Sequence, residues 1–269
     1  MRRLAKTILY RLGLGRVAER LYFNLKTATP RVILTEIGIR LFKTERQPVP
    51  PGRLIYDVIA CRWADVYLRS GRKLADSLNE TARAVGFEFR GDTNVLDFGC
   101  GCGRLTRYLI EDTDSRIFGT DYNPQLIAWC RAHLPRATFS TNHLAPPLGC
   151  RDAMFDLVIA RSVFTHLTEE MQMRWLDEMQ RILRTDGFLY LSLHGPLLAS
   201  GLSAEQRARF DAGEIVVIHE DAEGANLCSS FAGPEFVRSR FTRDFELVRY
   251  EPGRPVTHLR QDVYVLRRK

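Results

Sequence analysis

The stretch that most constrains the fold is residues 95–103, which read Val-Leu-Asp-Phe-Gly-Cys-Gly-Cys-Gly. Apolar residues surround one aspartate, as at the end of a buried strand, and three glycines follow. A helical pattern then begins at Arg104. Glycine has no side chain to keep a ligand away from backbone N–H groups. The segment therefore predicts a strand, a tight turn and a helix N-terminus that together bind an adenosine-containing cofactor.

Strand-like and helix-like segments alternate from residue 94 onward. Helices are expected between the strands at 104–111, 123–133 and 169–184, and the expected strands are 94–98, 116–120, 137–141, 155–161 and 187–193. This order implies a mostly parallel sheet with right-handed crossovers. Late strands near 245–250 and 262–267 suggest an antiparallel pair on the sheet edge. The predicted fold class is α/β, a Rossmann-like seven-stranded mostly parallel sheet with an antiparallel C-terminal strand pair and an N-terminal helical extension.

The chain divides at the Pro-rich run 47–52. Residues 1–46 have the spacing of short amphipathic helices, so we expect 1–52 to form a basic helical extension and 53–269 the main domain. Within that domain, 53–90 is expected to be a helical cap and 196–242 an insertion on the substrate side. Candidates to line the substrate pocket are Tyr56, Trp63, Tyr67, Phe231 and Phe236.

Positive charge is concentrated at the N-terminus. Residues 1–53 hold twelve Lys or Arg against three Glu, a net charge of +9, so the remainder of this +7 chain carries −2. The main domain is therefore near neutral. The basic extension is a candidate for peripheral contact with a membrane or a protein through residues 1–46.

Six cysteines are scattered along the chain, and no two have Cys-x-x-Cys spacing. A disulfide framework or a metal site is not expected, because no nearby His or Cys pair completes a tetrahedral ligand set. No apolar run is long enough to span a bilayer, and no signal-peptide pattern is present. We therefore expect reduced thiols in a cytoplasmic protein.

Asp121 fits two possible cofactors, and two further residues distinguish between them. Asp121 follows the second expected strand, where a carboxylate can bind the ribose hydroxyls of either NAD or S-adenosylmethionine. The dinucleotide fingerprint requires a third glycine at the position occupied here by Arg104. Asp97 suits a cationic amino group better than an anionic pyrophosphate. The residues therefore favour a sulfonium-bearing zwitterion over a dinucleotide.

Four segments, in order, resemble motifs of the class I S-adenosylmethionine-dependent methyltransferases. They are the glycine motif 95–103, the acidic strand end Gly119-Thr120-Asp121-Tyr122-Asn123, the fourth-strand segment 155–167, and the turn 183–189. Thr185-Asp186-Gly187 departs from the family's usual Pro-Gly, although Asp-Gly also forms turns. The likeness is strongest over residues 90–195 and is closest to bacterial small-molecule and glycan-type enzymes. It leaves the first 90 residues unexplained.

The resemblance and the strand-end positions together assign a candidate site. Two histidines that follow strands, His166 and His194, are candidate general bases, since histidine titrates near neutral pH. The alternative, that His166 packs against or caps the helix for which Thr168 is the N-cap, has strong support in its Phe-Thr-His-Leu context. The candidate cofactor-binding residues are Asp97, Gly99, Cys100, Gly101, Gly103, Asp121, Tyr122, Asn142, His143 and Arg161.

The expected reaction is direct in-line methyl transfer from S-adenosylmethionine to an oxygen of a small molecule or sugar. N-methylation remains an alternative, because nitrogen nucleophiles use the same donor. A nucleic-acid methyltransferase is disfavoured, since Ala160-Arg161-Ser162-Val163 stands where an Asn-Pro-Pro-Tyr-type motif would be. A non-catalytic S-adenosylmethionine-binding module that docks a partner or membrane through its basic N-terminus is the third possibility.

Overall fold

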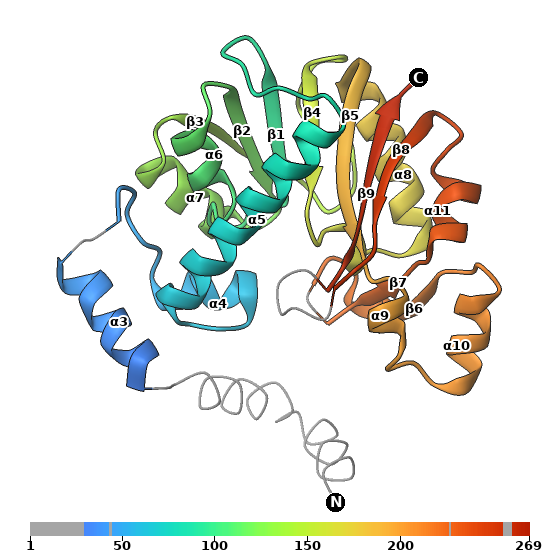
Figure 1. Ribbon diagram of the computed structural model, residues 1–269, viewed down its shortest axis with the longest axis horizontal. Coiled ribbons are helices and arrows are strands. Elements are labelled where there is room, and N and C mark those ends of the chain that lie inside the picture. Colours follow the sequence, from blue (N-terminus) through green and yellow to red (C-terminus); the bar gives the residue numbers. More distant parts are fainter. Residues whose placement is uncertain (1–29, 43–44, 226, 255–259) are drawn as a thin grey trace, which may run out of the picture.

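The computed structural model describes residues 30–42, 45–225, 227–254 and 260–269. Its central sheet has seven strands in the order β3-β2-β1-β4-β5-β9-β8, and β1 to β5 run parallel (Figure 1). Strand β9 is antiparallel to both of its neighbours, β5 and β8. The predicted α/β fold class, including the antiparallel C-terminal pair, is confirmed.

The strands of the central sheet have these bounds: β1 Asn94–Phe98, β2 Arg116–Asp121, β3 Ala137–Thr141, β4 Phe155–Ala160, β5 Leu183–Leu193, β8 Phe245–Glu251 and β9 Asp262–Arg268. A separate two-stranded antiparallel sheet consists of β6 Val216–Ile218 and β7 Ser229–Phe231.

The α-helices are α3 Pro30–Phe42, α4 Gly52–Ile59, α5 Ala64–Ala84, α6 Thr106–Asp112, α7 Pro124–His133, α8 Glu169–Ile182, α9 Pro196–Ala199, α10 Ala204–Asp211 and α11 Pro234–Arg240. Short 3-10 turns are η1 Phe164–His166 and η2 Glu220–Ala222. Side chains before the helices bind their first N–H groups: Asn123 accepts from Gln125 N at 3.0 Å, and Thr168 accepts from Met171 N at 3.3 Å. These bonds explain where α7 and α8 begin.

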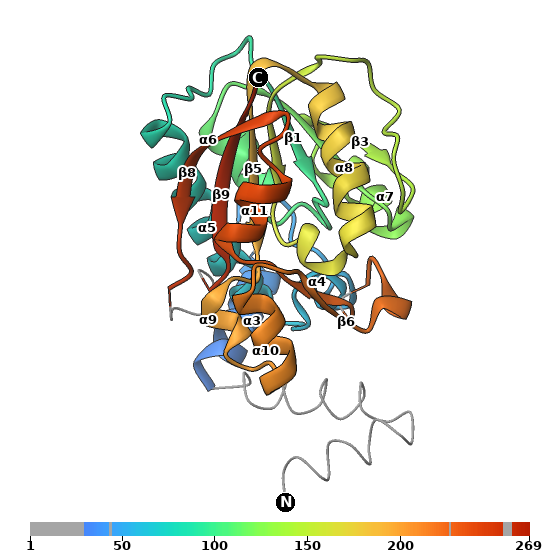
Figure 2. The ribbon, with the colours of Figure 1, turned by 90° about the vertical axis from the view of Figure 1, so that its right-hand side faces the viewer.

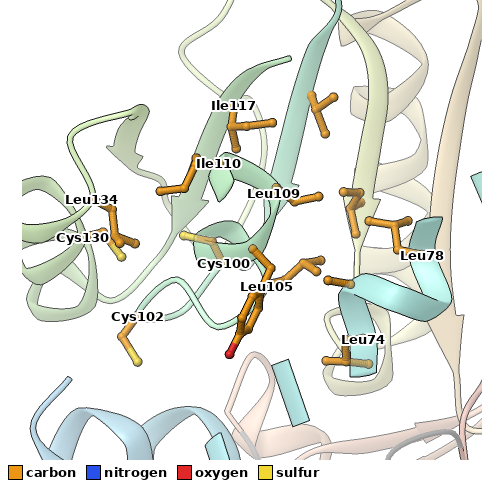
Figure 3. Close-up of a cluster of buried hydrophobic side chains, with 14 of the residues drawn as sticks. Leu74, Leu78, Cys100, Cys102, Leu105, Leu109, Ile110, Ile117, Cys130 and Leu134 are labelled. Atoms are coloured by element: carbon orange, nitrogen blue, oxygen red, sulfur yellow. The ribbon is translucent and has the colours of Figure 1, made fainter. Parts of the chain in front are cut away.

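The sheet has a hydrophobic core on each face, because successive strand residues point to opposite sides. On β1, Val95 packs with α5, α6 and α7, whereas Leu96 packs with α8 and α11. Figure 3 shows the first core, where Leu74 and Leu78 of α5 approach Leu105 and Leu109 beside the glycine loop. Both faces are thus covered, and the strand ends are left to form a site.

The segment expected to form the helical cap contains two helices, α4 and α5. Ala60 adopts a left-handed conformation (φ 53°) and its N–H bonds to the carbonyl of Tyr56, which ends α4 before α5 begins. Residues 1–29 of the predicted extension lie outside the described residues, and the domain boundaries stay a prediction. No helix in the described ranges is both long enough and apolar enough to cross a membrane.

Two further features differ from the sequence expectations. Strand β5 begins at Leu183 and contains the predicted turn as a bulge, with Asp186 at φ 61° and the register shifting between Leu183 and Phe188. Strand β7 was not predicted, because its three residues lack a recognisable period. It pairs with β6 and so closes the insertion after β5 into a small sheet (Figure 2).

Candidate active site

The candidate site lies at the carboxyl edge of the parallel strands, around the loop from β1 to α6. The loop continues through Leu105 before α6 begins at Thr106, two residues later than predicted. Gly99, Gly101 and Gly103 all have left-handed φ values, of 75°, 57° and 78°. A Cβ atom on Gly99 would lie 2.4 Å from Val163 Cγ2, and one on Gly101 would lie 2.7 Å from Val58 Cγ2. Glycine is therefore required here by both conformation and space.

The N–H groups of this loop point into the protein, which corrects the expectation that they are open to a ligand. Gly99 N and Cys100 N both donate to the Thr120 carbonyl, at 2.8 and 3.0 Å. Gly101 N donates to Asp121 Oδ2 at 3.0 Å, and Gly103 N donates to the Cys100 carbonyl at 3.0 Å. The first three donors tie the loop to β2, and the Gly103 donor closes a turn within the loop. These four N–H groups are therefore not free to bind a pyrophosphate.

Asp97 is the buried carboxyl at the end of β1. It is 3% exposed, and burial raises its pKa to about 6, although a hydrogen bond from Thr106 Oγ1 at 2.6 Å favours the ionised form. A buried anion without a full ion-pair partner is costly. A bound cation beside Asp97 would offset that cost.

Asp121 stands at the end of the neighbouring strand β2. Its Oδ2 accepts from Gly101 N, and its Oδ1 accepts from Asn123 N at 2.8 Å. Burial raises the pKa of this carboxyl as well. A carboxylate has about four acceptor positions, so Asp121 can still accept from two ligand hydroxyls.

Two arginines lie among these acids. Arg104 and Arg161 are close enough that, after burial, Arg161 is the main cause lowering the pKa of Arg104, while Asp97 raises it. Arg161 bonds to the hydroxyl of Tyr190 on β5. Arg161 is a predicted cofactor-binding residue, whereas Arg104 is predicted only to be incompatible with a dinucleotide. Its position directly after the glycine loop is the signal that was missed.

The other predicted cofactor residues have mixed surroundings. Tyr122 is half exposed beside Asp121, and His143 is exposed. Asn142 is engaged within the protein: its Oδ1 accepts from Thr120 Oγ1 at 2.6 Å and its Nδ2 donates to the His143 carbonyl at 2.6 Å. The amide of Asn142 therefore supports the turn after β3, and these two bonds leave one Nδ2 hydrogen and one Oδ1 lone pair for a ligand.

His166 has a defined tautomer. Its Nδ1 lies 2.7 Å from the carbonyl oxygen of Cys228, which can only accept, so Nδ1 carries the proton and Nε2 has the lone pair. Burial lowers the pKa of the half-buried His166 below its usual 6.5. At neutral pH the ring is thus a neutral base with its basic nitrogen specified by the protein.

His194 stands 6.4 Å from His166 between ring centroids, and its ring contacts Phe231 of β7 at 5.1 Å. Burial and the neighbouring His166 lower its pKa to about 4. Its Nδ1 is sealed from solvent and has no hydrogen-bond partner among the described residues. His194 is therefore a weaker base than His166.

The insertion after β5 builds the far side of this site. The backbone of His194 forms an isolated β-bridge with that of Phe231. The carbonyl of Cys228, just before β7, accepts the hydrogen bond from His166 Nδ1. Two predicted pocket residues belong instead to the core. Tyr67 is buried and donates its hydroxyl to the Cys102 carbonyl at 2.9 Å, and Phe236 is buried in the core under α8.

The thiols show no sign of metal binding or cross-linking. All six cysteines are free. Within the described ranges, no group of three His, Cys, Asp or Glu side chains is arranged to hold a metal ion.

Comparison with known proteins fits this geometry. Residues 95–187 match a family model described as a methyltransferase domain. The chain carries a class I S-adenosylmethionine-dependent methyltransferase domain. A probable S-adenosylmethionine-dependent methyltransferase of Mycolicibacterium smegmatis is 35% identical to it over 99 residues, which are 37% of each chain.

Other similar proteins extend the comparison. A malonyl-[acyl-carrier protein] O-methyltransferase of Acetivibrio thermocellus is 25% identical over 139 residues, covering 51% of this chain and 47% of that relative. The chain thus spans less than half the length of these curated relatives. The crystal structure of an S-adenosylmethionine-dependent methyltransferase from Mesorhizobium loti has a TM-score of 0.55 at 16% identity, covering 70% of this chain and 96% of that one. At that identity the likeness supports the fold.

The side chains of the methyltransferase domain fit S-adenosylmethionine. This cofactor has an ammonium, a carboxylate and two ribose hydroxyls. Buried Asp97 offers an anion, Arg104 a cation, and Asp121 a doubly accepting carboxylate. The consumed N–H groups of the loop are a poor match for a pyrophosphate.

Proposed function

We propose that the protein transfers a methyl group from S-adenosylmethionine to an oxygen of a small molecule or sugar, with His166 as the general base. The observation that carries the proposal is the bond between His166 Nδ1 and the Cys228 carbonyl. It leaves Nε2 unprotonated on a ring that is neutral at neutral pH. An uncharged alcohol needs such a base to lose its proton, whereas an amine with a free lone pair does not.

Three side chains would hold the cofactor. Asp97 would bind its ammonium group, Arg104 its carboxylate, and Asp121 its ribose hydroxyls. S-adenosylmethionine supplies an electrophilic methyl group on a sulfonium. The protein's contribution is alignment of the two reactants, worth up to about 7–11 kcal/mol of the barrier.

His166 would accept the acceptor's proton at Nε2 during transfer. The Cys228 carbonyl would stabilise the resulting imidazolium through the Nδ1 proton. A positioned base contributes roughly 10²- to 10⁴-fold. The printed name of the Acetivibrio relative includes O-methylation, which supports an oxygen acceptor, while other relatives are named for ribosomal protein L11. The six free thiols support placing this reaction in the cytoplasm.

Cofactor choice is tested by calorimetric titration of the full chain with S-adenosylmethionine and with NAD. Only the former should bind, and Asp121→Ala should abolish the binding heat. Binding of NAD, or normal S-adenosylmethionine binding by the variant, would contradict the site assignment.

The base is tested by S-adenosylhomocysteine release with pools of alcohols and sugars. His166→Gln should lower kcat by roughly 10²- to 10⁴-fold and leave cofactor affinity unchanged. His133→Gln is the matched control, because His133 Nδ1 also bonds a carbonyl, that of Trp129 at 2.8 Å, but on α7, which packs on the opposite face of the sheet from η1. Equal turnover by the two variants would exclude His166 as the base.

A further inference from the structure

Helix α3 carries an apolar stripe that no other described part of the protein covers. Ile33, Leu34, Ile37 and Leu41 are 41%, 69%, 48% and 70% exposed. At 3.6 residues per turn these four positions fall within an arc of about 100°. Ile39 belongs to the main core and lies on the opposite side of the helix. One side of α3 therefore attaches to the protein and the other faces outward.

This stripe stands apart from the rest of the described surface. Only two other large hydrophobic side chains there are exposed, Tyr122 and Leu144, and neither lies on a helix. Single exposed apolar residues are normal, but a contiguous stripe marks an interaction surface.

The charge around the stripe indicates its partner. Residues 1–53 hold twelve Lys or Arg against three Glu, while the remainder of the chain carries −2. Apolar side chains on a helix within a strongly basic segment suit an anionic bilayer, which offers both acyl chains and phosphate. A second copy of this chain has little negative charge to offer. We propose that α3 docks the protein on an anionic membrane surface through Ile33, Leu34, Ile37 and Leu41.

Docking through α3 would also orient the active site. Both views place α3 at the end of the molecule that holds α4, α9 and α10 (Figures 1 and 2). Val58 of α4 abuts Gly101 of the glycine loop, so this end is the carboxyl edge of the sheet. The bound protein would turn that edge toward the lipid, where an amphiphilic acceptor can present a hydroxyl-bearing head. This choice of acceptor rests on the proposed function, whereas the docking does not.

The test is co-sedimentation of the full chain with vesicles of phosphatidylcholine alone or with phosphatidylglycerol. The protein should bind the anionic vesicles, and binding should weaken as salt rises. Leu34→Glu/Leu41→Glu should weaken it at least about tenfold, since two half-buried leucines in lipid are worth more than 1.4 kcal/mol. The matched control, Ala128→Glu/Ala132→Glu, adds the same charge to exposed positions of α7 and should bind like the parent.

Circular dichroism and Tm should be unchanged in both double variants, because all four side chains are exposed. Equal vesicle binding by the α3 variant and the parent would overturn the proposal. Failure of the parent protein to bind anionic vesicles would also overturn it. If the parent is then a dimer and the α3 variant a monomer, the α3 stripe is a self-association surface. Vesicle binding does not depend on methyl transfer, so failure of the proposed reaction would not contradict the docking proposal.

Discussion

Replacing Asp97 with asparagine should stabilise the free protein. Burial raises the pKa of Asp97 from 3.8 to about 6. A carboxyl with a raised folded pKa contributes stability that is fully present below pH 3.8 and lost as pH rises through about 6. At pH 7 that loss is complete, and a shift of about 2 units corresponds to about 3 kcal/mol. Asp97→Asn should recover at most this much free energy of unfolding. The full amount requires that the asparagine oxygen still accepts the hydrogen bond from Thr106 Oγ1.

The assay is urea unfolding of parent and variant at two pH values. The variant should unfold with a free energy higher by up to about 3 kcal/mol at pH 7, and the difference should shrink to roughly half at pH 5. Saturating S-adenosylmethionine should reverse the order, because only the parent binds it and gains stability from ligand binding. The same carboxylate would then both destabilise the free protein and bind the cofactor.

Asp156 provides the matched control, because it is a buried carboxylate at the other end of the neighbouring strand β4. It accepts from Asn94 N at 2.6 Å and pairs with Arg184. Asp156→Asn should lower stability at pH 7, since it removes a satisfied charge. The reasoning is refuted if Asp97→Asn is no more stable than the parent at pH 7, or if the cofactor stabilises both proteins equally.

Three further outcomes are expected. Gly101→Ala should cost about 1–3 kcal/mol in urea unfolding and eliminate calorimetric cofactor binding, because it forces a side chain at φ 57° against Val58. Arg107→Met should lower stability by about 1.5–3 kcal/mol by calorimetry, since buried Arg107 donates to the carbonyls of residues 47–48, at 2.8 and 3.2 Å. The pH profile of kcat/KM should fall on its acid side below pH 6.5, as His166 becomes protonated; an acid limb that persists in His166→Gln would assign it to another group.

The sheet could be predicted because its signals are local. The buried strand 155–160 is apolar except for Asp156, and Asn123 and Thr168 mark the starts of the helices that follow them. Asp97 and Asp121 could be found for the same reason, since each ends a recognisable strand.

What could not be predicted depends on contacts between distant segments. The Thr120 carbonyl takes two N–H groups of the glycine loop only because β2 pairs with β1 in one register. Tyr67 is an aromatic residue of the type that lines pockets, but in the structure its hydroxyl donates to the Cys102 carbonyl in the core. The tautomer of His166 is set by a carbonyl 62 positions away, which no motif reveals.

That carbonyl has an evolutionary consequence. Cys228 belongs to the insertion after β5, a segment whose packing is separate from the loop that ends β1. Exchange of this insertion between relatives could alter acceptor choice while leaving the donor half intact. Under the proposed function, any replacement must again place a hydrogen-bond acceptor against His166 Nδ1, because that acceptor keeps the proton on Nδ1. Diversification of methyl acceptors in such a scaffold would therefore be constrained at the position that bonds His166 Nδ1, which here is the Cys228 carbonyl.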